Sequence, residues 1–213
     1  MTTVHRLTFN PFSENTYLII DQDSSTCAIV DPGCMDEEEE QLLVSEINRL
    51  GVTPTVCLNT HCHIDHILGN WFVFSKFGLK PHIHPMELTV LEAGSQVANM
   101  YGLPYRKSPD PAAFLDVTKS LEIGKTRLEL LFTPGHSPGS VSFYCKQSDF
   151  VIGGDVLFQQ SIGRTDLPGG NHTTLIQSIQ EKLMVLDDHI VVYPGHGPET
   201  TIGAERKFNP FLT

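Results

Sequence analysis

Residues 60–66 read Thr-His-Cys-His-Ile-Asp-His, and this stretch decides how the rest of the chain is interpreted. It holds three imidazoles and one carboxylate within six positions, namely His61, His63, Asp65 and His66. Imidazole and carboxylate groups are the usual protein ligands of zinc and of other first-row divalent metals. Hydrophobic patterning predicts a strand over residues 54–59 before the stretch and a helix over residues 65–77 after it. Side chains on the turn between them can converge, so the stretch predicts a metal site.

Three later segments place one ligand-type side chain beside glycine or proline. His136 stands in Pro-Gly-His, Asp155 in Gly-Gly-Asp and His196 in Pro-Gly-His-Gly, each directly after a predicted strand. Glycine and proline bend the chain where a strand ends, and loops at such ends carry functional groups. We therefore expect these three side chains to approach a common centre.

The seven positions, in this order, resemble the metallo-β-lactamase superfamily, with all seven ligand positions filled. The resemblance implies an α/β fold, an αββα sandwich of two mixed β-sheets flanked by helices, with the site at one edge of the sheets. It also implies a ligand set for each of two metal ions and one shared ligand. The first set is His61, His63 and His136, the second set is Asp65, His66 and His196, and the bridging residue is Asp155.

The expected cofactors are two divalent metal ions, with zinc favoured and with iron or manganese left open. Two such ions roughly 3.5–4 Å apart can share one water and lower its pKa toward ~7. A metal-bridging hydroxide is then the expected nucleophile, with Asp65 and Asp155 as the catalytic carboxylates. No Gly-x-Ser-x-Gly elbow occurs in the sequence, and this chemistry needs none.

Within the superfamily, residues 154–171 and the tail over residues 202–211 most resemble the short bacterial glyoxalase II-type hydrolases. The resemblance implies hydrolysis of a thioester, S-lactoylglutathione, to D-lactate and glutathione, the reaction of a hydroxyacylglutathione hydrolase. Longer enzymes of this type add a helical C-terminal domain that helps to hold glutathione, whereas 17 residues follow His196 here. Candidate carboxylate-binding groups are Arg164, Arg206 and Lys207, and surface or packing ion pairs are the alternative role for each.

Several other functions stay open at this point. A persulfide dioxygenase-like iron oxidoreductase needs two histidines and one aspartate, which this chain contains. Hydrolysis of another ester or of a lactone uses the same site, and a non-catalytic metal-binding protein is the alternative from a different class. Oxygen uptake with glutathione persulfide would favour the oxidoreductase, whereas anaerobic thioester cleavage would count against it.

Composition narrows the partners and the compartment. The 213 residues carry 14 basic and 25 acidic side chains, a net charge of −11, which disfavours nucleic acid and anionic membranes as partners. The expected partner is a small-molecule thioester, and a glutathione-linked thioester is one candidate. Five cysteines and the lack of a recognisable secretion signal favour a cytoplasmic protein. No long linker is apparent, so residues 1–213 are expected to form a single metallo-hydrolase domain.

Periodicity predicts the remaining elements. Strands are expected over residues 16–20, 27–30, 54–59, 81–84, 141–144, 150–152 and 190–193, with a hairpin over residues 121–132. Helices are expected over residues 36–50, 65–77, 85–100 and 173–186.

Five other side chains have a structural interpretation, and for Asp31 a functional one is also open. We expect Cys62 to be a buried packing residue, His82 and His84 to be structural, and Trp71 to lie in the core. Asp31 either forms a turn or supports the metal ligands through hydrogen bonds.

Overall fold

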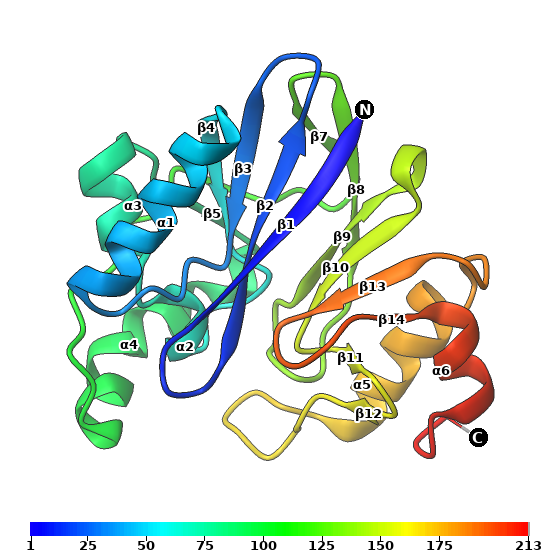
Figure 1. The fold of residues 1–213 in the computed structure, drawn as a ribbon. Helices are drawn as coiled ribbons and strands as arrows, with labels where there is room; N and C mark the ends of the chain where they lie inside the picture. The colour runs from blue at the N-terminus through cyan, green and yellow to red at the C-terminus, as the bar shows by residue number, and fades with distance from the viewer. Residues whose placement is uncertain (213) are drawn as a thin grey trace. The chain divides into compact units, whose positions relative to one another are not determined.

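The computed structural model of the protein describes residues 1–212. By the contacts between its residues, the chain divides into two compact units. The first unit comprises residues 1–115 and 122–126, and the second comprises residues 116–121 and the chain from residue 127 onward. Two six-stranded sheets and one two-stranded sheet make up the β-structure, and helices lie beside the sheet of each unit (Figure 1).

The first unit holds a mixed sheet with the strand order β1-β2-β3-β4-β5-β6. Its strands are β1 (Thr2–Phe9), β2 (Glu14–Asp21), β3 (Thr26–Val30), β4 (Thr53–Leu58), β5 (Pro81–Ile83) and β6 (Ala113–Phe114). Strands β1 to β3 pair antiparallel, and β3 to β6 pair parallel. The helices are α1 (Glu37–Leu50), α2 (Ile64–Ile67), α3 (Asn70–Phe77), the 3-10 turn η1 (Pro85–Glu87) and α4 (Leu88–Tyr101).

Helix α1 shows why these residues form these elements. Asp36 caps its N-terminus by accepting a hydrogen bond from the Glu39 N–H at 3.0 Å, and Gly51 ends it. Leu43 and Ile47 are buried together with apolar side chains from one face of the sheet. The predicted helix over residues 36–50 is thus confirmed, and burial of its apolar face anchors it.

The single helix predicted over residues 65–77 is wrong, because the chain forms two helices, α2 and α3, with a break at Gly69. The Gly69 N–H donates to the Pro32 carbonyl at 2.7 Å. A Cβ on Gly69 would lie 2.5 Å from Cys34 Sγ, so only glycine allows this close approach. The tertiary contact overrides the helical pattern and makes α2 a separate turn.

The second mixed sheet has the order β14-β13-β10-β9-β8-β7 and, apart from residues 122, 123 and 126, it belongs to the second unit, as does a small hairpin of β11 and β12. The strands of this sheet and the hairpin are β7 (Ser120–Ile123), β8 (Thr126–Phe132), β9 (Val141–Cys145), β10 (Phe150–Gly154), β11 (Leu157–Phe158), β12 (Ser161–Ile162), β13 (Val191–Pro194) and β14 (Thr200–Thr201). Strands β10 and β13 pair parallel, whereas β8, β9 and β10 pair antiparallel. The helical segments are the 3-10 turn η2 (Lys146–Ser148), α5 (His172–Ser178), η3 (Ile179–Leu183), which is a π-helical turn, and α6 (Ile202–Phe208).

The core of the second unit forms where α5 and η3 cover one face of the sheet. Leu175, Ile179 and Leu183 are fully buried in one cluster with Val151 and Val192 of strands β10 and β13. The helix predicted over residues 173–186 is present over residues 172–183, with a π-helical second part, and it ends three residues earlier than predicted. In the part of the chain that the structure describes, no helix is long and apolar enough to cross a membrane.

Candidate metal centre

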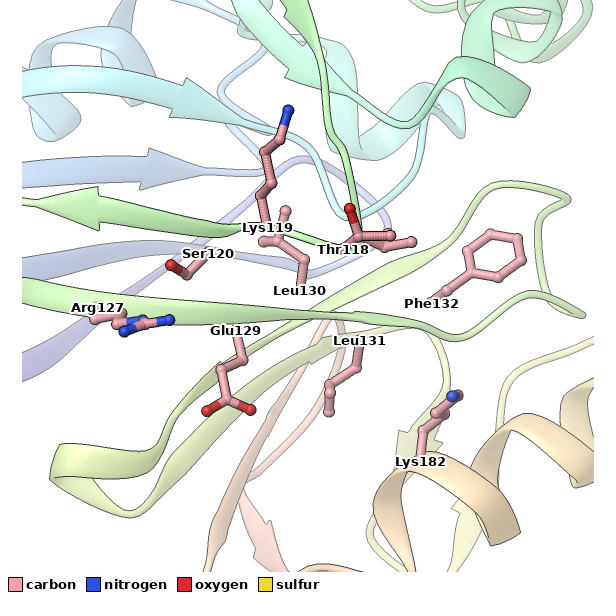
Figure 2. Close-up of a pocket in the computed structure, with 10 residues that line it drawn as sticks. Thr118, Lys119, Ser120, Arg127, Glu129, Leu130, Leu131, Phe132 and Lys182 are labelled. Atoms are coloured by element: carbon pink, nitrogen blue, oxygen red, sulfur yellow. The ribbon is translucent and has the colours of Figure 1, made fainter.

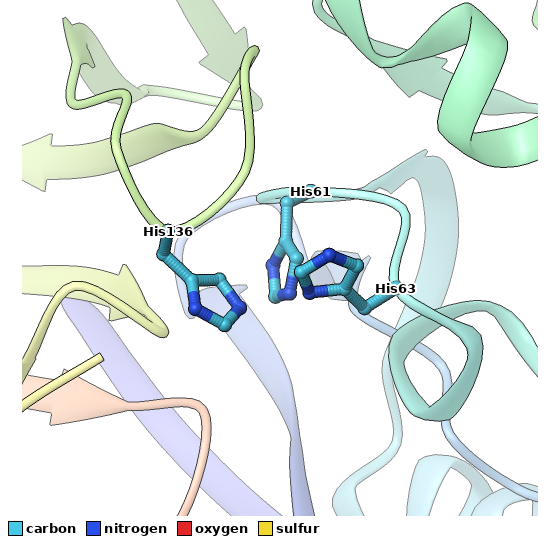
Figure 3. A group of neighbouring side chains, drawn as sticks. All are labelled: His61, His63 and His136. Atoms are coloured by element: carbon cyan, nitrogen blue, oxygen red, sulfur yellow. The ribbon is translucent and has the colours of Figure 1, made fainter. Parts of the chain in front are cut away.

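The seven candidate ligands divide between the two units. His61, His63, Asp65 and His66 belong to the first unit, and the other three, His136, Asp155 and His196, belong to the second. Each group follows the carboxyl end of a strand. In the first unit, His61 and His63 lie on the loop after β4 (Figure 3), and helix α2 carries the other two.

The imidazoles of the first unit lie close together. The ring centroids of His61 and His63 are 4.8 Å apart at an interplanar angle of 90°, and those of His61 and His66 are 4.1 Å apart. Potential ligand atoms of Asp31, His61 and His66 lie within 4.8 Å of one another. Asp65 Oδ2 is 3.7 Å from His66 Nε2. His61 and His66 are fully buried, so the structure holds strongly polar rings away from bulk water.

Asp31 organises these rings through hydrogen bonds. Its carboxylate accepts from the Thr60 N–H at 2.7 Å, from the Thr60 hydroxyl at 2.5 Å and from His66 Nδ1 at 3.1 Å. The Thr60 hydroxyl gives its proton to Asp31, so it accepts a hydrogen bond from His61 Nδ1 at 3.1 Å. The structure thus supports the second of the two roles expected for Asp31, which also adopts a turn conformation with φ 48°.

These bonds specify the tautomers of the rings. A carboxylate, or a hydroxyl that already donates its own proton, can only accept a hydrogen bond from Nδ1. The ring proton therefore lies on Nδ1. In the neutral rings of His61 and His66, the nitrogen that can act as a metal ligand is then Nε2. This arrangement, with one ring nitrogen held by a protein group, is typical of metal-binding histidines.

The second unit presents a carboxylate between two imidazoles. Asp155 Oδ2 lies 3.5 Å from His136 Nε2 and 3.4 Å from His196 Nε2. His136 stands on the loop that follows β8 (Figure 3), and its Nδ1 donates to the Arg164 carbonyl at 2.8 Å. A carbonyl oxygen can only accept, so His136 is also set to use Nε2 as a ligand.

The donor sets fit divalent cations on chemical grounds. Each unit brings together histidine nitrogens and a carboxylate, and in three of the rings Nδ1 is held by a protein acceptor. Nitrogen and oxygen donors of this kind suit zinc, iron and manganese alike. Within each unit the structure brings these donors close together, and the ligand roles of the seven residues stay predictions.

Three side chains that were not predicted from the sequence hold the ligand segment from outside, and two of them, Asn59 and Glu87, are buried. The Asn10 amide donates to the Asp65 carbonyl at 3.1 Å, and the Asn59 amide donates to the His66 carbonyl at 2.9 Å. Glu87 accepts a hydrogen bond from the Cys62 N–H at 2.7 Å. The sequence held one signal for Glu87, an acidic residue four positions before the apolar Leu91 in the helix expected over residues 85–100, but nothing that pointed to Cys62.

Glu14 was also missed, and it lies in the same buried region. The side chain is fully buried and accepts from the Thr16 hydroxyl at 2.9 Å, while its other oxygen is 3.9 Å from His66 Nδ1. Burial raises the pKa of this carboxyl well above its usual range, and the nearby His66 opposes that effect. An acidic residue at the head of the apolar strand β2 was the available signal.

A cavity of about 410 Å³ in the second unit is a different feature. Its lining includes Thr118, Arg127, Glu129 and Lys182 but none of the seven candidate ligands (Figure 2). In Figure 2 the Lys119 and Lys182 side chains lie on opposite sides of strand β8. The positive charges do not converge, so this cavity gives no sign of a charged ligand.

The remaining candidates have structural roles. Cys62 is 1% exposed within an apolar cluster, as expected. His82 Nδ1 bonds to the Cys57 carbonyl, and His84 Nδ1 accepts from the Met86 N–H, so both are structural. The expectation that Trp71 is a core residue is wrong: it is 36% exposed and stacks on Arg106, whose Cζ lies 4.3 Å from the ring centroid.

The basic candidates near the C-terminus engage protein groups. Arg164 pairs with Asp166 at 2.7 Å, and Arg206 donates to the Met184 and Leu186 carbonyls at 2.8 Å. The ammonium of Lys207 lies 5.0 Å from the centroid of the neighbouring Phe208 ring. These contacts favour the packing interpretation of the three residues over the carboxylate-binding one.

Comparison with known sequences shows which protein family and which relatives this chain resembles. The profile of the family described as the metallo-beta-lactamase superfamily matches residues 9–196, a span that includes all seven candidate ligands. The chain is 43% identical over 208 residues to the probable metallo-hydrolase YqgX of Bacillus subtilis, covering 97% of this chain and 96% of that protein. It is 36% identical over 203 residues to the hydroxyacylglutathione hydrolase GloC of Haemophilus influenzae, covering 94% and 93%.

Solved structures agree with the fold class. The crystal structure of BLEG-1 B3 metallo-beta-lactamase matches with a TM-score of 0.91 and 38% identity, covering 99% of this chain and all of that one. The structure of TTHA1623 in a di-iron-bound form matches with a TM-score of 0.87 and 36% identity, covering 98% and 100%. The expected fold, with two mixed sheets flanked by helices, is confirmed.

Proposed function

Because this chain belongs to the metallo-beta-lactamase superfamily, we propose that it is a metal-dependent hydrolase that cleaves a thioester such as S-lactoylglutathione. The family places the chain among the metallo-hydrolases, and the near full-length likeness to GloC supports the substrate class. The observation that carries the proposal is the pair of donor sets, with buried His66 beside Asp31 in one unit and Asp155 between two histidines in the other.

In this proposal both donor sets serve one centre with two divalent metal ions, of which zinc is the first choice. The residues that would hold the first ion are His61, His63 and His136, those for the second are Asp65, His66 and His196, and Asp155 would be shared. When bound, such ions lower the pKa of water toward ~7 and supply a nucleophile at neutral pH. The di-iron form of TTHA1623 supports iron as a second choice of metal.

The protein's own residues orient the donors and handle protons. Asp31 holds His66 by its Nδ1 proton, and the Arg164 carbonyl does the same for His136. The Asp65 side chain is 15% exposed, so its carboxylate can exchange a proton with solvent. A thiol has a pKa near ~8.5, so a thiolate leaves with little help from a general acid. The small number of proton donors in the site therefore suits a thioester.

The proposed partner is a small-molecule thioester, with glutathione thioesters as the first choice, and not nucleic acid or a membrane. We place the protein in the cytoplasm, where its five free, buried cysteines would stay reduced. Arg164, Arg206 and Lys207 are not assigned to substrate because each has a protein contact.

Three other activities are alternatives that a substrate panel can distinguish from thioester cleavage. The likeness to BLEG-1 supports a β-lactam as the second candidate. Oxygen uptake with glutathione persulfide by the iron-loaded protein would favour the persulfide dioxygenase-like activity, and another ester or a lactone would use the same donors.

The test is a substrate panel on the purified, metal-loaded protein under nitrogen. We expect cleavage of S-lactoylglutathione, measured by loss of thioester absorbance and release of free thiol, to exceed hydrolysis of a chromogenic cephalosporin. Oxygen uptake with glutathione persulfide, measured separately in air-saturated buffer, should be absent. Faster turnover of the cephalosporin, or persulfide-dependent oxygen uptake, would overturn the thioester assignment.

A further inference from the structure

The ligand segment over residues 60–66 is held at four peptide groups by side chains that lie outside it. Asp31 accepts from the Thr60 N–H, and Asn10 and Asn59 donate to the carbonyls of Asp65 and His66. The fourth bond is the one from the Cys62 N–H to Glu87 Oε2, at 2.7 Å. Of these bonds, only the one to Glu87 falls between His61 and His63.

The position of that bond gives it a specific consequence. The Cys62 N–H belongs to the peptide plane that joins His61 to Cys62, and each residue has only two soft backbone torsions. An acceptor that fixes this plane restrains the directions in which the neighbouring histidine side chains leave the backbone. The observed result is a 90° angle between the His61 and His63 rings at a centroid distance of 4.8 Å.

Glu87 is built into the fold as a fixed acceptor. Its side chain has no exposed surface, and its own N–H donates to the His84 carbonyl at 2.9 Å in the turn after β5. Four residues later Leu91 packs in the cluster that contains Cys62, so helix α4 anchors the carboxylate on the same side of the loop. Burying a carboxylate costs free energy, which an apolar residue at this position would avoid.

We propose that Glu87 is a positioning residue for the metal centre: its buried carboxylate fixes the Cys62 peptide and thereby the angle between the His61 and His63 rings. This inference rests on the proposed metal site but not on the identity of the substrate. The fixed Cys62 peptide should raise the metal affinity of the site, because ligands that are already oriented bind an ion more tightly than ligands that must be ordered.

The test is zinc affinity of the full chain, measured by competition with a chromogenic chelator. Glu87→Ala and Glu87→Asp should weaken zinc binding about 10- to 100-fold, the range for lost outer hydrogen bonds to metal sites. The aspartate variant retains the charge but is one methylene too short to reach the Cys62 N–H. Glu87→Gln should stay within about threefold of the wild type, because its amide oxygen can accept the same bond.

A matched control separates positioning from general stability. Asp21 is also a buried carboxylate of the first unit and accepts from backbone N–H groups, including that of Thr126. It stands at the far end of β2 from Glu14, on the order of 20 Å away at the usual rise per residue. Asp21→Asn should lower the melting temperature and leave zinc affinity within about twofold, because it touches no ligand segment.

Hydrogen exchange of the metal-free protein gives an independent readout. The Cys62 amide should exchange faster in Glu87→Ala than in the wild type, while amides of the core strand β2 keep their protection. Folded Glu87→Ala and Glu87→Asp proteins with wild-type zinc affinity would overturn the proposal, as would an equal loss in Asp21→Asn. Should the wild type bind zinc without cleaving any thioester, the proposed substrate would fail while the role of Glu87 would stand.

Discussion

Asp31 and His66 form a fully buried pair in which the Asp31 carboxylate lies 3.1 Å from His66 Nδ1. The same carboxylate accepts two hydrogen bonds from Thr60, the first residue of the ligand segment. One side chain thus sets both the start of the segment and the tautomer of one of its last ligands. This explains how a short turn after β4 can present several donors in a fixed arrangement.

Replacement of Asp31 should disrupt that arrangement, although Asp31 is not one of the seven candidate metal ligands. Asp31→Ala leaves the Thr60 N–H and His66 Nδ1 without their acceptor, and we expect activity to fall about 10- to 100-fold. Steady-state kinetics with S-lactoylglutathione measures the effect. Asp36→Ala, which removes the cap of α1, should cost about 1 kcal/mol of stability with little effect on activity. Full activity of folded Asp31→Ala would contradict the role given to this pair.

Asp155 should be essential for full metal occupancy. Its carboxylate lies within 3.5 Å of both His136 Nε2 and His196 Nε2, so Asp155→Ala removes the shared donor of the second unit. We expect metal content below two ions per chain and loss of activity, measured by elemental analysis and turnover. Asp166→Asn is the control, since that exposed carboxylate pairs with Arg164 and is not one of the seven candidate ligands, and it should keep both properties. Retained activity in Asp155→Ala would refute the bridging assignment.

Local pattern predicted most of the helices and strands and singled out the candidate ligands, whereas the αββα fold was implied by the family resemblance. Helix α1 was predictable because its cap, acidic first turn and apolar stripe lie within one short stretch, and the hairpin of β7 and β8 because of its Gly124 turn. The break at Gly69 was not, because it comes from a contact with Pro32, far away in the sequence. Glu87 was missed for the same reason, since only the fold brings it to Cys62.

Gly163 should tolerate no side chain. A Cβ at this position would overlap the Asp155 carbonyl and lie 3.2 Å from His136 Nδ1. Gly163→Ala must therefore displace one of these groups, at a cost of typically ~1–3 kcal/mol for overpacking, together with weaker metal binding. Chemical unfolding and elemental analysis measure both effects.

Gly153→Ala is the matched comparison in the same unit. The nearest atom to its Cβ would be Val192 Cγ1 at 3.5 Å, an ordinary van der Waals contact. This variant should remain close to the wild type in stability and metal content. Equal behaviour of the two alanine variants would show that the close packing around Asp155 is unimportant.

The cysteines should be unreactive in the folded protein. All five are buried, and burial raises the pKa of Cys27 to about 12 and that of Cys62 well above its usual range. Thiolates are the reactive species, so at pH 8 a disulfide reagent should label the native chain only through unfolding. In denaturant the same reagent should titrate five thiols. Rapid labelling of a thiol in the folded, metal-loaded protein would contradict this burial.

Metal removal and return tests the central claim most directly. The protein is stripped with a chelator, dialysed and titrated with zinc while S-lactoylglutathione cleavage and bound metal are followed together. We predict that the stripped protein is folded and inactive, and that activity returns in full as two equivalents of zinc bind. Undiminished thioester cleavage by protein shown to be free of transition metal would contradict the account.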